Sequence, residues 1–335
     1  MTQHHLPEPS RLADRFHRWA FRRWYPVAAR VAPIWPRWFE LIASRWVIYV
    51  IMAVYPRPKR LIRRNLAHIL GRSPWSWHVR RTCRRMLGYF GMYHSDLFRF
   101  TQLPLEAARA ELDEVVGMEH LEAAARSGKG AVLLTAHFGN YELGGVLLGR
   151  LELPVSIVYV KDKYAQAEEY RSLMRGHGQV EEIAIEPGGA WSSLPVLRAL
   201  RAGRLVAMQG DRDLDGRGIP TRFFGLPILL PRGPFLVALL TGTPIIPTFV
   251  SYTPGRRFEC RVYPPIEVPA GPDRERDLAH AANRWAAVLE REVRRCPEQW
   301  YTFYDYFADH LAEPRAPVPA AVELSGPRAA GQARA

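Results

Sequence analysis

The sequence predicts an α/β fold with a mostly parallel or mixed central sheet flanked by helices. Short apolar runs, such as AVLLT at 131–135 and VSIVYV at 155–160, recur between turn residues and are typical of buried strands. Segments with helical periodicity separate these runs, and such alternation indicates strands that lie parallel to one another. With 335 residues, 48% of them hydrophobic and 24% charged, the chain can bury a large core. This composition excludes disordered, collagen-like and disulfide-stapled proteins.

The distribution of charge predicts three regions. Residues 1–100 contain 19 arginines and lysines against four acidic residues, whereas the remaining residues contain 27 basic and 29 acidic ones. The net charge of +13 therefore lies in the N-terminal third. We expect a basic helical arm that associates with a membrane at 1–103, an α/β body at 104–311, and a disordered tail rich in Ala, Pro, Arg and Gly at 312–335.

The arm contains three predicted helical segments. Between Arg11 and Arg30, apolar residues recur every three or four positions among arginines, which is typical of an amphipathic helix at a membrane surface. In the segment 38–54, the uninterrupted apolar run is about half of the ~20 residues that a spanning helix needs. We expect a re-entrant, interfacial or buried helix there. Leu61 to Leu70 continue with an apolar stripe beside arginines, and no cleavable signal peptide is expected.

The basic arm predicts an anionic partner, and three classes fit: nucleic acid, an anionic membrane or an acidic carrier protein. No helix-turn-helix, zinc-finger, RNP or KH signature accompanies the arginines. Amphipathic segments rich in tryptophan favour lipid over a phosphodiester backbone. The expected partner is therefore anionic membrane lipid, and no nucleic acid is expected.

The body is predicted to alternate strands and helices after a helix at Met118–Ser127. Strands are expected at 131–135, 155–160, 181–185, 204–209, 244–252 and 257–263. Helices are expected at 164–177, 191–202, 235–241 and 278–295, and one more is expected to begin at Asn140 and to run to about 151.

The strongest catalytic candidate in the body is His137, which follows a buried strand and precedes a helix. Glu142 falls in the first turn of that helix, where the two side chains can meet. A carboxylate that accepts from one ring nitrogen fixes the tautomer and raises the basicity of the other nitrogen. The sequence also leaves open a purely structural histidine. It contains no GxSxG elbow, Walker A loop or GxGxxG turn after a strand.

No metal site is expected. The segment DRDLDG at 211–216 matches the opening of an EF-hand loop, but its twelfth position is Arg222 and it follows a strand. Cys83, Cys260 and Cys296 form neither a CxxC pair nor a zinc-like cluster.

The stretch HFGNYE at 137–142 resembles the HX4(D/E) signature of the lysophospholipid acyltransferase superfamily. Four further stretches resemble, in order, elements of the bacterial late acyltransferases of lipid A biosynthesis, the lauroyl and myristoyl transferases. They are RRNL at 63–66, GDRD at 210–213, a glycine–proline block over 223–247 and PEQW at 297–300. The resemblance covers about residues 40 to 305. The chain departs from the family in YTFYDY after PEQW, where a basic run is usual, and in Glu40 and Arg45 within the apolar segment.

This resemblance implies a membrane-associated acyltransferase at the cytoplasmic face of a bacterial inner membrane. It would move a fatty acyl chain from acyl carrier protein, or from acyl-CoA, to a hydroxyl of a lipid A precursor or related glycolipid, without a cofactor. His137 is the expected general base and Glu142 its orienting carboxylate. The expected substrate-binding residues, each with a structural alternative as a turn residue, helix cap or solvated side chain, are Asn140, Asp211, Arg212, Asp213 and Arg232. Two alternatives stay open: an acyltransferase for glycerophospholipids or lysophospholipids, and a non-catalytic protein that binds lipid or nucleic acid.

Overall fold

The computed structural model describes residues 35–54, 56–100, 110–144, 153–160, 180–185, 193–213 and 216–307, together with residues 27, 30, 103, 107 and 172. Apart from residues 27, 30 and 172, the segments predicted as helices at 11–30 and 164–177 lie outside this part of the chain. The predicted tail at 312–335 also lies outside it. The division into arm, body and tail therefore stays a prediction.

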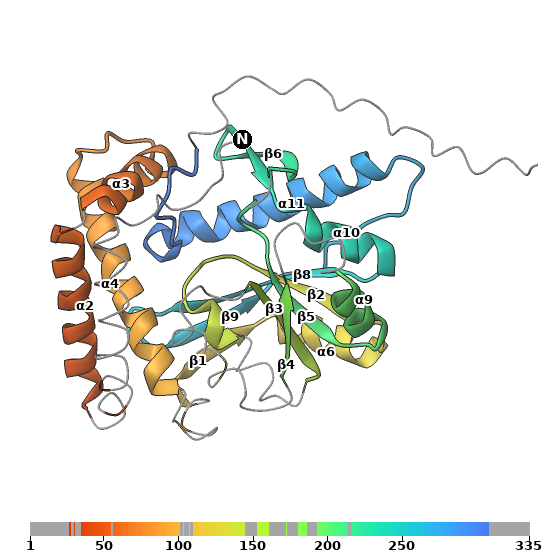
Figure 1. Ribbon diagram of the computed structural model, residues 1–335, viewed down its shortest axis with the longest axis horizontal. Coiled ribbons are helices and arrows are strands. Elements are labelled where there is room, and N and C mark those ends of the chain that lie inside the picture. Colours follow the sequence, from red (N-terminus) through yellow and green to blue (C-terminus); the bar gives the residue numbers. More distant parts are fainter. Residues whose placement is uncertain are drawn as a thin grey trace, which may run out of the picture.

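Three helices occupy the described N-terminal region: α2 (Arg37–Val54), α3 (Pro56–Leu70) and α4 (Trp77–Phe100). Figure 1 shows α2 beside α4 at one end of the molecule, with α3 across their ends. Their approach is close, since a Cβ atom on Gly91 of α4 would lie 2.7 Å from the carbonyl oxygen of Ser44. Within the described ranges, no single helix is long and apolar enough to cross a bilayer; α2 and α3 reach that length only together, across a bend of 101°.

The body is built on a seven-stranded sheet in the order β1-β9-β8-β2-β5-β3-β4. All neighbours are parallel except β8 and β9. The strands are β1 (Leu112–Val116), β2 (Ala131–Thr135), β3 (Val155–Val160), β4 (Glu181–Ile185), β5 (Leu205–Gln209), β8 (Ile245–Tyr252) and β9 (Phe258–Val262). The predicted α/β class is confirmed, and all six predicted strands are present, with ends that differ by at most one residue.

Two features of the sheet layer were not predicted from the sequence. Strand β1 is an edge strand whose acidic residues are exposed, so its pattern lacks the apolar run of a buried strand. The hairpin of β6 (Ile219–Phe223) and β7 (Leu226–Leu230) spans the start of the glycine–proline block. Its two turn residues, Phe224 and Gly225, both have positive φ, 49° and 80°, as a tight hairpin turn requires.

Helices α6 (Met118–Ser127), α9 (Leu194–Arg201), α10 (Arg232–Thr241) and α11 (Arg274–Arg295) flank the sheet, as Figure 1 shows. Helix α11 begins four residues before its predicted start because Asp273 caps it and accepts a hydrogen bond from the backbone N–H of Arg276 at 3.1 Å. It is followed by the 3-10 turn η1 (Pro297–Gln299).

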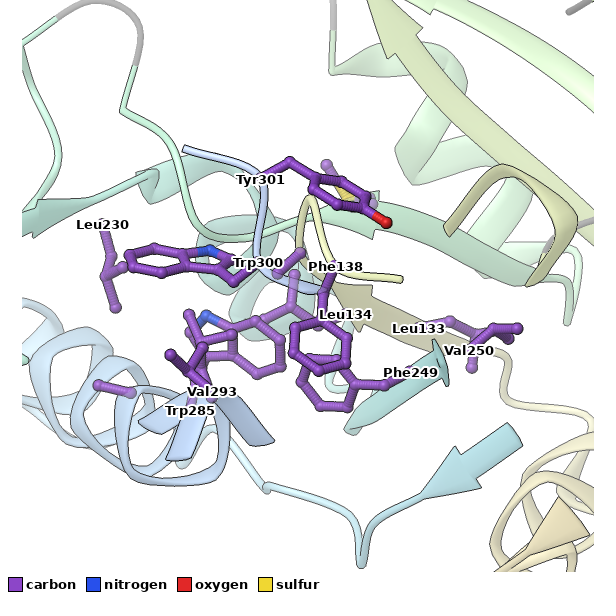
Figure 2. Packing of buried hydrophobic residues seen from close by; sticks show 14 of the residues in the cluster. Leu133, Leu134, Phe138, Leu230, Phe249, Val250, Trp285, Val293, Trp300 and Tyr301 are labelled. Carbon is purple, nitrogen blue, oxygen red and sulfur yellow. The ribbon is translucent and has the colours of Figure 1, made fainter. Parts of the chain in front are cut away.

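An aromatic core lies under the ends of the central strands. Figure 2 shows Phe138, Phe249, Trp285 and Trp300 packed together. The rings of Phe249 and Trp285 are stacked, with centroids 5.6 Å apart. The indoles of Trp285 and Trp300 are both fully buried. The Trp285 Nε1 donates to the carbonyl oxygen of Gly210 at 2.8 Å. This core therefore supports the chain segments that leave β2 and β5.

Candidate active site

The candidate site begins where β2 ends. Strand β2 lies between β5 and β8, and the chain then turns through His137 to Asn140. The C-terminal segment holds this turn: Tyr301 N–H donates to the His137 carbonyl and Gly139 N–H donates to the Gln299 carbonyl, both at 2.8 Å. Residues 141–144 are helical, as predicted, and the predicted remainder of that helix lies outside the described residues.

Gly139 is the residue that lets this turn pass so close to β8. Its φ of +59° falls in the left-handed region, and a Cβ atom there would lie 2.0 Å from the carbonyl oxygen of Val250. Only glycine meets both conditions without displacing the backbone. The position of His137 therefore depends on a glycine two residues later.

The buried partner of His137 is Asp211. Its Oδ1 lies 2.8 Å from the His137 Nδ1, and its Oδ2 accepts from the His137 backbone N–H at 3.1 Å. Asp211 follows β5, and the carboxyl ends of the parallel neighbours β2 and β5 meet at one edge of the sheet. A residue 74 positions after the histidine thus supplies a carboxylate to its Nδ1, and the orienting role of Glu142 stays a prediction. The substrate-binding role of Asp211 also stays a prediction.

The Asp211 side chain is completely buried and well supplied with donors. Trp300 Nε1 donates to its Oδ2 at 3.2 Å, and the Tyr306 hydroxyl donates to its backbone carbonyl at 2.9 Å. Burial alone would raise the pKa of Asp211, but the charge and hydrogen bonds of His137, together with Arg212, lower that pKa to about 2. The carboxylate is therefore ionised at neutral pH.

An ionised Asp211 determines which nitrogen of His137 is available. A carboxylate is an acceptor only, so Nδ1 carries the proton and Nε2 of the neutral ring keeps its lone pair. The His137 side chain retains 17% exposure, and its ring packs edge-on against Tyr141 at 5.3 Å. Tyr141 in turn hydrogen-bonds the Tyr93 hydroxyl of α4 at 2.9 Å. The arrangement can accept a proton at Nε2.

Asn140 caps the helix after the turn, because its Oδ1 accepts from the Leu143 N–H at 3.2 Å. Its Nδ2 donates to Asp96 Oδ2 of α4 at 3.1 Å, and the Tyr252 hydroxyl donates to the same oxygen at 2.6 Å. The other oxygen of Asp96 pairs with Arg37 of α2 at 2.6 Å. Asn140 thus caps the helix and links the His137 turn to the N-terminal helices, and its part in substrate binding stays a prediction.

The two arginines predicted to bind substrate both contact other parts of the protein. Arg212 donates to the Tyr301 carbonyl at 2.7 Å, and its guanidinium lies 5.3 Å from the ring centroid of Tyr304. Arg232 forms two hydrogen bonds with Glu275 of α11, one of them at 2.7 Å. These contacts are enough to give both side chains a structural role.

Glu142 and Asp213 complete the predicted set. Glu142 is half-buried in the helical residues 141–144. The Asp213 Oδ2 accepts from the Gly218 N–H at 3.2 Å, as a residue that closes a turn does. Contributions of either residue to substrate binding or chemistry stay predictions.

Two of the resembling stretches meet at Asp211, and residues in and after them were missed as site residues. Asn65, from RRNL, donates to the Tyr304 carbonyl at 2.7 Å and accepts from the Tyr306 N–H at 3.1 Å. This fixes the segment after PEQW, from which Trp300 and Tyr306 reach Asp211. A buried indole N–H requires an acceptor, and this requirement is the signal that could have identified Trp300.

A histidine held by a buried carboxylate at the carboxyl edge of a parallel sheet has the chemistry to accept a proton from a hydroxyl group. The chain belongs to the bacterial lipid A biosynthesis acyltransferase family, whose family model matches residues 28–308. It is an acyltransferase.

Its relatives include phosphatidylinositol mannoside acyltransferases of mycobacteria. Those of Mycobacterium tuberculosis strains CDC 1551 / Oshkosh and ATCC 25618 / H37Rv are each 28% identical over 260 residues, which cover 76% of this chain and 78% of theirs. The protein of that name from Mycolicibacterium smegmatis (strain ATCC 700084 / mc(2)155) is 28% identical over 259 residues, covering 76% of this chain and 81% of its own.

Proposed function

We propose that this acyltransferase moves a fatty acyl chain from acyl carrier protein, or from acyl-CoA, to a sugar hydroxyl of a membrane glycolipid, with His137 as general base. The observation that carries the proposal is the contact of 2.8 Å between the His137 Nδ1 and the buried Asp211. The family description names lipid A, and the relatives are named for phosphatidylinositol mannoside. Both names support a glycolipid acceptor.

The reaction needs one proton transfer in each direction. The acceptor hydroxyl attacks the thioester carbonyl while Nε2 of His137 takes its proton, which gives a tetrahedral intermediate and an imidazolium. The C–S bond then breaks, and the imidazolium returns the proton to the departing thiolate. Asp211 stabilises the imidazolium and keeps the ring oriented throughout. The acyl chain is never bonded to the protein, so this route needs no nucleophilic serine or cysteine.

The protein works at the surface of an anionic membrane, on its cytoplasmic side, where the acidic carrier protein delivers the donor. An exposed apolar stripe on α2 supports this part of the proposal: Trp38, Ile42 and Trp46 are 61%, 45% and 64% exposed. Spacing by four residues aligns these side chains on one face of the helix. Large apolar side chains on one face indicate a surface that another phase or partner covers.

The experiment is a transfer assay with purified protein, with acyl carrier protein and CoA as separate donors. The acceptors are a lipid A precursor, a phosphatidylinositol mannoside and a lysophospholipid, and products are weighed by mass spectrometry. We expect a mass gain of one acyl chain on a glycolipid. His137→Ala should lose transfer by about 10³-fold, because general-base catalysis contributes about 10² to 10⁴.

The matched control is His280→Ala, which removes an exposed histidine from α11. It should transfer at the wild-type rate. Near-normal transfer by folded His137→Ala would contradict the general-base assignment. Acylation of the lysophospholipid alone would reassign the enzyme to glycerophospholipid chemistry, and no product from any pair of substrates would favour a binding role.

A further inference from the structure

The N-terminal part of α4 carries a pocket that the proposed chemistry does not use. Its volume is about 410 Å³, and its lining residues are Trp75, Trp77, Arg80, Arg81 and Arg84. We propose that this pocket binds the phosphate group of an anionic membrane lipid. The proposal deepens the proposed membrane association and rests on it, but it does not rest on acyl transfer.

The charge of the pocket fits a phosphate. Between Glu40 and Asp96 the sequence contains eleven arginines and lysines and no acidic residue. Arg85, which points to the body, pairs with Glu298 at 2.6 Å. Within the described ranges, no ion pair is formed by Arg80, Arg81 or Arg84. Guanidinium groups bind phosphate oxygens in pairs of parallel hydrogen bonds, so three such groups around one hollow make a phosphate site.

The two indoles point to lipid rather than to a soluble anion. Trp75 and Trp77 are 75% and 62% exposed. Arg63 lies 4.3 Å from the ring centroid of Trp75, and Arg81 lies 5.1 Å from that of Trp77, so both indoles are held by cation–π contacts while they face outward. Tryptophan is enriched at the membrane–water interface, where its apolar ring and its N–H are both satisfied.

The pocket also has the right depth relative to α2. The α4 positions against α2 include Gly88, close to Arg45, and Gly91, close to Ser44. Arg84 lies one helical turn before Gly88, on the same face of α4. The Tyr49 hydroxyl of α2 donates to the backbone carbonyl of Arg84 at 3.1 Å. The three arginines of the pocket therefore lie beside and beyond the C-terminal end of α2.

This placement sets the arginines about one helix layer behind the exposed stripe of α2. Packed helices have axes about 8–10 Å apart, and the headgroup layer of a bilayer is about 5–8 Å thick on each side. When Trp46 and Val50 of α2, 64% and 60% exposed, reach the hydrocarbon boundary, the pocket lies at the level of the lipid phosphates. Apolar stripe and basic pocket thus match the two layers of one leaflet.

The test is co-sedimentation of the full chain with vesicles of phosphatidylcholine alone and with added phosphatidylglycerol. The variant Arg80→Gln/Arg84→Gln should partition about 30-fold more weakly to the anionic vesicles, since each arginine near such a surface contributes about 1 kcal/mol. Its weak partition to phosphatidylcholine should be unchanged. Trp75→Ala/Trp77→Ala should weaken binding to both kinds of vesicle.

The matched control is Arg198→Gln/Arg201→Gln, which removes two exposed charges from α9. It should lower the partition by less than about twofold, because charges beyond a Debye length of the membrane are screened. If both double variants lost the same amount of vesicle binding, net charge alone would explain the effect, and the proposed phosphate site would be overturned. Intact vesicle binding combined with lost binding of acyl carrier protein would assign the pocket to an acidic protein and also overturn the proposal.

Acyl transfer measured on detergent-dispersed acceptor separates the two proposals. The variant Arg80→Gln/Arg84→Gln should transfer at the wild-type rate in detergent, because that reaction does not require binding to a bilayer. If transfer fails in wild type while the vesicle result stands, the proposed reaction is wrong and the lipid site remains. Loss of transfer by the pocket variant in detergent would place the arginines in the reaction and overturn their assignment as a membrane site.

Discussion

At the scale of single residues, the candidate site depends on the contact between His137, whose side chain is 17% exposed, and the fully buried Asp211. The carboxylate is ionised because its partners outweigh the cost of burial, and its ionised state selects the Nδ1 tautomer of the histidine. Trp300 adds a donor to the same oxygen that receives the His137 backbone N–H. The three contacts leave Asp211 little freedom to turn away.

Replacing Asp211 by asparagine tests the orientation of the ring. The amide keeps the shape of the side chain but removes the charge and permits the wrong tautomer, so we expect the rate of transfer to fall by about 10³ to 10⁴. The substrate KM should change little. The control is Asp113→Asn on β1, which removes the charge of an exposed partner of Arg257 and should keep full activity. A wild-type rate for folded Asp211→Asn would contradict the pairing.

The same residue predicts how stability depends on pH. The pKa of Asp211 is about 2 in the folded protein, below its ordinary value of 3.8, so the folded state binds this proton more weakly than the unfolded chain. Its stabilising contribution is complete above about pH 4 and disappears as the pH falls through about 2. Between these limits the wild type should lose about 2 kcal/mol of unfolding free energy that Asp211→Asn does not lose.

Chemical denaturation of both proteins at several acidic pH values measures this difference. Parallel curves of stability against pH would show that Asp211 titrates normally in the folded state.

At the scale of elements, the turn after β2 determines where the histidine lies. The turn has positive φ at Gly139, its backbone N–H groups donate to carbonyls of β8 and η1, and its His137 carbonyl accepts from Tyr301 after η1. Its geometry is therefore set by three parts of the chain that are distant in sequence.

Gly139→Ala should disrupt this turn. A side chain at positive φ costs about 1 kcal/mol or more, and the new Cβ atom would also overlap the Val250 carbonyl. We expect a loss of more than about 2 kcal/mol in unfolding free energy and a greatly reduced transfer rate. Gly242→Ala is the control, because Gly242 has φ of +66° but no atom within 4 Å of the added Cβ. Equal effects of the two substitutions would show that the close approach to Val250 is unimportant.

At the scale of the whole molecule, a buried chain of polar groups connects α2 to the His137 turn. It runs from Arg37 through Asp96 to Asn140, with Tyr252 of β8 on the same carboxylate. The helix that presents the apolar stripe is thus joined to the turn that carries the proposed base.

Asp96→Ala should be strongly destabilising, because it removes the carboxylate that pairs with Arg37 at 2.6 Å and accepts hydrogen bonds from the buried Asn140 and Tyr252. We expect a loss of about 3 kcal/mol or more in unfolding free energy, together with slower transfer. Arg232→Gln, which breaks an exposed pair with Glu275, should change stability by less than about 1 kcal/mol. Urea unfolding measures both, and a small effect for Asp96→Ala would mean that α2 is held by apolar packing alone.

Local pattern alone predicted the strands and helices of the body, because apolar periodicity reports directly which face of an element is buried. It failed at β1, whose acidic residues lie on an exposed edge, and at the hairpin of β6 and β7, which is hidden among prolines and glycines. The identity of His137 as the candidate base also followed from its place after a buried strand.

The partner of that histidine was decided only by the tertiary structure. Glu142 was predicted because it is near in sequence, and its role stays a prediction. Asp211 is near in space, because parallel pairing of β2 with β5 brings the ends of two distant strands together. The same holds for Trp300 and Tyr306, which contact Asp211, and for Asn65, which binds the segment that carries them. Periodicity encodes burial one element at a time, but strand order and register determine which buried polar groups must satisfy one another.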